Sequence, residues 1–126
     1  MAGEQEFNSY RDLRVWQMAM SIAERCYRET KSFPREELFG LTSQIRRAAG
    51  SIAANIAEGH GRESTGSFIQ FLRIAQGSTK ELETHLLLAQ RVEVLTSPQA
   101  EALLSSSDEL GKMLRSLIRS LERKGP

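Results

Sequence analysis

The feature that most constrains the fold of this sequence is a helical repeat of apolar residues, interrupted in only a few places. Gly and Pro gather in three short stretches, at residues 32–34, 59–66 and 96–98. These breaks leave four long segments, over about residues 10–31, 35–58, 64–95 and 97–124. No segment shows the strict alternation of a half-buried strand. The sequence therefore predicts four helices and an all-α fold.

Apolar or small residues recur every three or four positions along each segment, which places them on one helical face. The predicted core positions are Val15, Ala19, Ile22 and Cys26; Leu41, Ile45, Ala48, Ala49, Ile52, Ala53 and Ile56; Phe68, Leu72, Ala75, Thr79, Leu82, Leu86 and Ala89; and Ala100, Leu103, Ser107, Leu110, Leu114, Leu117 and Leu121. Because the connections are short, the segments are expected to form an up-down-up-down antiparallel four-helix bundle. Within it, Gly77 is predicted to mark close packing, and Ser97 to cap the last helix with Pro98 at its first position.

Length and charge place the chain among ordinary globular proteins. Its 126 residues suit a single domain, expected over residues 10–124 after a tail at 1–9. The 17 basic and 16 acidic residues give a net charge of +1, which excludes a strongly basic nucleic-acid tail or an acidic disordered chain. The single cysteine, Cys26, suits a reducing cytoplasm. Since no apolar run reaches 18 residues, no membrane helix is expected.

Residues for catalysis or metal binding are sparse. The chain has two histidines and no Glu-x-x-His motif, so the di-metal site of some bundles is not expected. Glu81 and His85, four residues apart, are interpreted as a surface or partner-facing pair, and His60 as an exposed loop residue. The glycine-rich stretch at 59–66 lacks the strand and the Gly-Lys-Ser/Thr ending of a phosphate-binding loop. We therefore predict no enzyme, no catalytic residue, no metal and no cofactor.

A row of polar residues lies beside the apolar face of the second segment. Gln44, Ser51, Asn55 and Glu58 follow one another at offsets of seven, four and three. Two interpretations stay open: an exposed polar border, or hydrogen bonds across a helix pair that fix its register. In the second case Ser78 and Glu81 of the third segment are the candidate partners.

Basic residues cluster at the end of the chain. Residues 112–124 contain five basic side chains and one acidic side chain, Glu122, for a local net charge of +4. The candidate nucleic-acid contacts are Lys112, Arg115, Arg119, Arg123 and Lys124 here, and Arg46 and Arg47 in the second segment. Arg62 and Arg73 extend this set if the fold brings them close. The alternative, a solvated helix face with favourable charge at its carboxyl end, stays open.

Several motifs together resemble one known family. They are Tyr10-Arg11-Asp12-Leu13 with Val15-Trp16; Thr30-Lys31-Ser32-Phe33-Pro34; Gly40 to Ala48; Ser51-Ile52-Ala53-Ala54-Asn55-Ile56-Ala57-Glu58-Gly59; Phe71 to Ala75; and Gly77-Ser78 followed by Glu81-Leu82-Glu83. Over about residues 7–121 the chain resembles the bacterial intervening-sequence proteins, whose genes were first noted within inserts of large-subunit ribosomal RNA genes. The accessory variability protein of diversity-generating retroelements is a related branch.

The resemblance implies a small cytosolic bundle that assembles into a ring of five subunits, without known enzymatic activity for most members. The related branch binds nucleic acid and a reverse transcriptase through a basic surface, whereas this chain is nearly neutral. From the resemblance we expect a ring-like homo-oligomer with no membrane partner. From the carboxyl-terminal stripe and Arg46-Arg47 we expect it to bind RNA or DNA through basic patches. The alternative is a scaffold that binds another protein and no nucleic acid.

Overall fold

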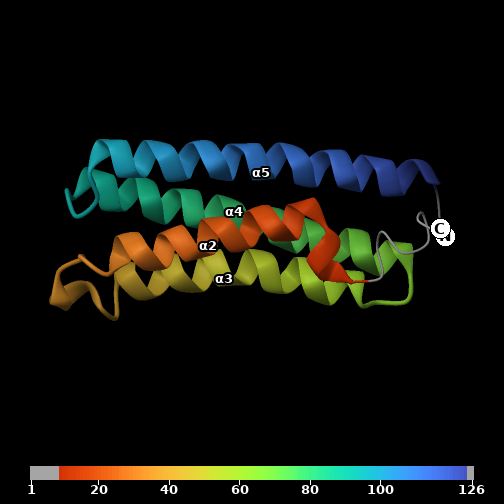
Figure 1. Cartoon of the computed structure of the whole chain (residues 1–126), viewed down its shortest axis with the longest axis horizontal. Helices are drawn as coiled ribbons and strands as arrows, with labels where there is room; N and C mark the ends of the chain where they lie inside the picture. Colours follow the sequence, from red (N-terminus) through yellow and green to blue (C-terminus); the bar gives the residue numbers. More distant parts are fainter. Residues whose placement is uncertain (1–8, 125–126) are drawn as a thin grey trace.

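The computed structural model describes residues 9–124, so the predicted tail lies outside the described residues except for Ser9. The elements in chain order are η1 (Tyr10–Asp12), α2 (Arg14–Thr30), η2 (Arg35–Glu37), α3 (Leu41–His60), α4 (Thr65–Arg91) and α5 (Ser97–Lys124). The α-helices lie side by side along the long axis of the molecule (Figure 1). This part of the chain contains no strand, which confirms the prediction of an all-α fold with four helices.

The order of the helices around the bundle follows from which of them touch. α2 packs against α3 and α5, and α4 packs against the same two helices. In the described chain, the diagonal pairs α2–α4 and α3–α5 make no close backbone approach. Consecutive helices run in opposite directions (Figure 1), as in an up-down-up-down bundle. The outer faces of α3 and α5 are therefore separate surfaces.

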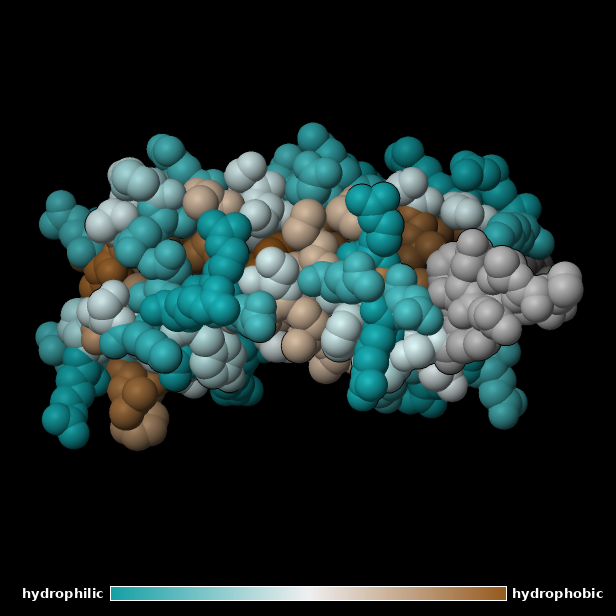
Figure 2. All heavy atoms as spheres, viewed as in Figure 1, coloured by the Kyte–Doolittle hydropathy of each residue, from teal (hydrophilic) through white to brown (hydrophobic). Residues whose placement is uncertain are grey.

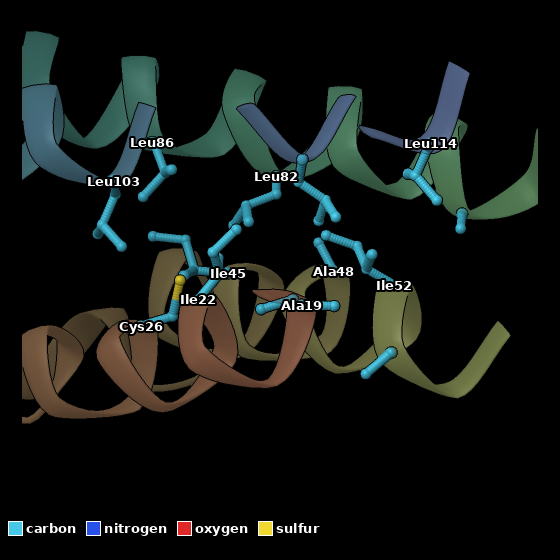
Figure 3. Packing of buried hydrophobic residues seen from close by; sticks show 14 of the residues in the cluster. Ala19, Ile22, Cys26, Ile45, Ala48, Ile52, Leu82, Leu86, Leu103 and Leu114 are labelled. Atoms are coloured by element: carbon cyan, nitrogen blue, oxygen red, sulfur yellow. The ribbon is translucent and has the colours of Figure 1, made fainter. Parts of the chain in front are cut away.

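The core is a single cluster of mostly aliphatic side chains between the four helices, with Cys26 and Phe33 among them (Figure 3). The predicted core positions of the first three segments are buried, except that Phe68 is half-buried. In α5 the buried position after Leu114 is Ile118, and the predicted Leu117 and Leu121 are half-buried. A helix of about 3.6 residues per turn drifts away from a strict seven-residue repeat, so the core seam moves by one residue near the end of this long helix.

The first two predicted segments each begin with a separate 3₁₀ turn. Leu13 is extended and buried, and it separates η1 from α2. η2 precedes α3, and the Glu37 carboxylate accepts a hydrogen bond from the Leu41 N–H at 3.1 Å. This carboxylate satisfies one of the free N–H groups of the first turn of α3. α3 then continues to His60, past the predicted end at 58.

The connection between α4 and α5 has well-defined caps. α4 ends at Arg91 instead of 95, because Glu93 takes a left-handed conformation (φ 68°) and the Val94 N–H bonds the Ala89 carbonyl. The cap of α5 is Thr96, not Ser97 as predicted. Thr96 and Gln99 exchange side-chain-to-backbone hydrogen bonds of 3.0 and 3.3 Å, a capping box.

Gly59 and Gly77 differ in the space around them. A Cβ atom on Gly59 would lie 2.6 Å from the Cβ of Phe71, so Gly59 lets α3 and α4 approach closely. A Cβ atom on Gly77 would meet nothing within 4 Å, and the residue is exposed. The prediction that Gly77 marks close packing within the chain is therefore wrong.

Candidate nucleic-acid interface

The predicted basic stripe forms one exposed face of the second half of α5. Lys112, Arg115, Arg119 and Arg123, which we call the basic face, surround a depression of about 340 Å³ together with Ser116. Lys112 lies 3.5 Å from Asp108, a contact between two exposed side chains. Within residues 9–124 the three arginines form no ion pair, so their charge is available to an external anion. Lys124 is exposed at the end of the same helix.

Two basic residues of α4, Arg73 and Lys80, lie beside the basic face. The Arg73 guanidinium donates a hydrogen bond of 2.7 Å to the Glu122 carboxylate of α5, so the fold brings Arg73 to the stripe. Lys80, one of the exposed residues of α4, lines a hollow of about 280 Å³ between α4 and α5 together with Arg115. Sequence reasoning missed Lys80. The seven-residue spacing from Arg73 to Lys80 was the available signal, because it places both residues on one face of α4.

Arg46 and Arg47 do not join this surface, because they lie on α3, diagonal to α5. Arg46 donates a hydrogen bond of 2.8 Å to the hydroxyl of Thr30, and its guanidinium lies 4.6 Å from the centre of the Tyr27 ring. These contacts tie the start of α3 to the end of α2. Arg47 is exposed and lines a separate groove between α3 and α4. Arg62 lines none of the hollows that contain the stripe, and it forms an ion pair of 2.8 Å with Glu58.

The polar row contains a hydrogen-bonded centre and exposed ends. The hydroxyls of Ser51 and Ser78 lie 2.9 Å apart and join α3 to α4, and the Asn55 amide donates to the Ser51 hydroxyl at 3.0 Å. Ser78 is buried, whereas Ser51 and Asn55 are half-buried. Gln44 and Glu81 line the groove that also contains Arg47, and Glu58 is exposed. Within the polar row, the hydrogen bond that the described residues make across the helix pair joins the two serines.

The two histidines and the cysteine lie in three different surroundings. His85 lies 3.7 Å from Glu81 one turn earlier. His60 is the last residue of α3, half-buried with its ring edge-on to Phe68, so the prediction of an exposed loop histidine is wrong. Burial raises the pKa of the Cys26 thiol to about 12, which makes it a poor nucleophile. Among the residues that the structure describes, no group of three or more His, Cys, Asp or Glu side chains is placed to hold a metal ion.

Exposed apolar side chains gather at the end of the bundle opposite the basic face. Phe39, in the connection between η2 and α3, is 90% exposed, and Leu38 beside it is 48% exposed. Figure 2 shows brown spheres projecting where this connection lies. Leu87, Leu88 and Val92 are exposed around the end of α4. None of the helices in the described range is both long and apolar enough to cross a membrane.

Fold and surface thus define a class: a helical bundle with a cationic helix face. The family of the 23S rRNA-intervening sequence protein matches residues 11–116, and the chain belongs to this family. It is also similar to the crystal structure of a protein of unknown function from the S23 ribosomal protein family of Bacteroides thetaiotaomicron. The two chains are 33% identical with a TM-score of 0.74, and the match covers 82% of this chain and 97% of the other. No curated protein matches the sequence significantly.

Proposed function

We propose that this protein is a non-enzymatic, cytoplasmic homo-oligomer that binds RNA or DNA through the basic face of α5. The observation that supports this proposal best is the arrangement of Arg115, Arg119 and Arg123. They lie on one helix face, all three are exposed, and none has a carboxylate partner within residues 9–124. Guanidinium groups match the geometry of phosphate oxygens and keep their charge at every physiological pH.

The physics of phosphate binding sets the size of the expected effect. Each phosphate neutralised on a duplex steepens the dependence of log affinity on log salt by about 0.9. If the four cations of the basic face each contact a phosphate, affinity per subunit should fall roughly 150-fold between 50 and 200 mM salt. A chain with a net charge of only +1 therefore needs a local cluster of cations, such as the basic face, to bind nucleic acid.

Assembly into a ring is the second part of the proposal. The resemblance to intervening-sequence proteins implies five subunits, and the exposed apolar residues at one end of the bundle support burial against other copies. A ring would present the basic face several times to one polyanion, so that modest contacts add up to strong binding. Light scattering should then give about five times the chain mass of 14.1 kDa.

The experiment is fluorescence anisotropy of a labelled structured RNA titrated with the protein at low and moderate salt. Light scattering on the same sample checks the oligomer mass. The variant R115E/R119E/R123E should lose binding at every salt concentration tested. Retained affinity in this variant would contradict the proposal.

A matched control separates the basic face from general charge. R28E/R35E/R91E changes the net charge equally at exposed arginines outside the basic face. The control should retain the wild-type mass and affinity. If both triple variants lose binding to the same extent, net charge alone explains the affinity, and the basic face is not the site.

The second candidate function is a scaffold for another protein. The exposed Phe39 and the apolar residues around the end of α4 favour it, because an apolar contact survives high salt. Failure of the correctly assembled protein to bind RNA or DNA at low salt would favour this scaffold. The substitution F39S should then abolish capture of a protein partner in 0.5 M salt.

A further inference from the structure

We propose that the groove between α4 and α5 holds the phosphate backbone of a nucleic-acid duplex and does not read its bases. This inference rests on the proposed nucleic-acid binding and specifies its site and its ligand. We call the site the α4–α5 groove, formed by residues 73–80 of α4 and 111–122 of α5. It consists of the hollow of about 280 Å³ described above and an adjoining hollow of about 120 Å³ that shares Arg115 with it.

Two glycines keep this groove open. Gly77 of α4 and Gly111 of α5 both line it, and a Cβ atom on either would meet nothing within 4 Å. A glycine inside a helix is destabilising relative to alanine. No contact in the described chain requires either glycine, so their effect is to leave room between the helices. The opening lets a polyanion backbone approach the helix axes.

Positive charge lines the groove from both helices. Arg115 and Arg119 of α5 lie on one side, and Arg73 and Lys80 of α4 lie on the other. Lys80 also forms an ion pair of 3.2 Å with Glu83 of the same helix. A phosphate chain in the groove therefore meets cations on both sides, whereas the outer side of the basic face supplies them on one side only. Gln76, which lines both hollows, adds an amide donor suited to phosphate oxygens.

The chemistry of the lining favours a duplex over a single strand. Proteins that hold single strands stack bases on aromatic side chains, and no aromatic residue lines the two hollows in the described structure. Arg73 and Lys80, which line the groove, are seven residues apart on α4, a rise of about 10 Å. A duplex presents about six phosphate charges over that length. Cations held in a row on a helix match the fixed phosphate spacing of a duplex. A single strand is flexible and would have to be ordered on binding.

Among the described residues that line the groove, Glu122 is the one carboxylate, and it competes with the ligand. Its ion pair of 2.7 Å with Arg73 crosses the groove from α5 to α4, and both side chains are about half exposed. A phosphate that replaced Glu122 would free a cation that is neutralised in the unbound protein. Removing the carboxylate should therefore strengthen binding, a gain that a merely structural role of Glu122 does not produce.

The first test uses E122Q, with E101Q as the matched control. Both replace an exposed carboxylate on α5, but Glu101 lies near the other end of the helix. With a labelled 20-base-pair RNA duplex and its DNA counterpart, E122Q should bind about eightfold more tightly at 0.1 M salt, with a salt slope steeper by about 0.9. E101Q should change neither. Equal affinity for wild type and E122Q, or equal gains in both variants, would overturn the role of the groove.

The second test fills the groove without changing charge. G111L should weaken duplex binding about eightfold, like the loss of one phosphate contact in K80Q, whereas G50L should leave it unchanged. Gly50 is an exposed helical glycine of α3 with the same open surroundings. Wild-type affinity of both G111L and K80Q would overturn the proposal.

The third test compares ligands. At equal phosphate concentration the protein should prefer the duplex to a single strand of mixed sequence, and different duplex sequences should bind equally. A preference for the single strand would overturn the proposal. If R115E/R119E/R123E abolishes binding while E122Q, K80Q and G111L have no effect, the groove is wrong but the basic face stands. If the wild-type protein binds neither ligand, both proposals fail.

Discussion

Replacing Gly59 by alanine is expected to lower the free energy of unfolding by about 1–2 kcal/mol, although alanine is the better helix former. The backbone of Gly59 is helical, so its φ and ψ angles accept alanine. The obstacle is the neighbouring helix: the new methyl group would lie 2.6 Å from the Cβ of Phe71 and 3.1 Å from a ring carbon of Phe68. A Cβ atom moves only with its backbone, so α4 must shift.

Two opposing terms give the magnitude. Alanine gains at most about 1 kcal/mol of helix propensity, and less next to the end of a helix. Overpacking of a filled site costs about 1–3 kcal/mol. The net loss should appear in urea denaturation at pH 7, measured at a fixed protein concentration because assembly contributes to stability.

The matched variant is G77A, which makes the same chemical change in open space. It should gain up to about 1 kcal/mol, because the propensity term acts without a clash. Equal effects of the two substitutions, or a stabilised G59A, would refute the argument that Gly59 serves the close approach of α3 and α4.

Three further stability predictions and one on reactivity follow from individual side chains. The hydroxyl of Ser107 is buried without a hydrogen-bond partner, so S107A should raise the free energy of unfolding by about 1 kcal/mol in urea titrations. A double-mutant cycle of S51A and S78A should give a coupling energy of about 1 kcal/mol for the bond between the two hydroxyls, and additive effects would contradict it. E93G should raise the melting temperature, because a non-glycine residue in the left-handed region costs about 1 kcal/mol. With its pKa raised to about 12, the Cys26 thiol stays protonated at pH 8, so iodoacetamide should modify it only after unfolding, as mass spectrometry would show.

Helix positions were predictable because burial follows the helical period. Around Ile45 and Ile52, small and branched residues recur every three or four positions, so they lie on one helix face. Ile45 and Ile52 are buried. The error at Leu117 comes from extending a seven-residue repeat along a helix whose period differs from it. The capping box at Thr96 was readable from Gln99 three residues later, but the adjacent Ser97-Pro98 pair gave a competing signal.

The candidate site was less predictable because its properties depend on contacts between helices. The sequence shows that Gly77 has no Cβ atom. It does not show whether a neighbouring helix fills the space beside this glycine. Arg46 is a cation in the sequence, whereas its contact with Thr30 depends on how α2 meets α3. Lys80 lies beside the basic face only because α4 packs against α5 in one particular register. The helical period of the sequence does not determine that register.

The side-by-side packing of α2 and α5 has a consequence for chain connectivity. The beginning of α2 and the last turns of α5 lie at the same end of the bundle, where Leu13 and Leu117 line one hollow. A short linker could therefore join α5 directly to η1, and the chain could be reopened in the exposed connection between α3 and α4. Such a circular permutant would keep every helix contact. It would also place α5 in the interior of the chain, so that the order of the helices along the chain could be changed while the groove stays intact.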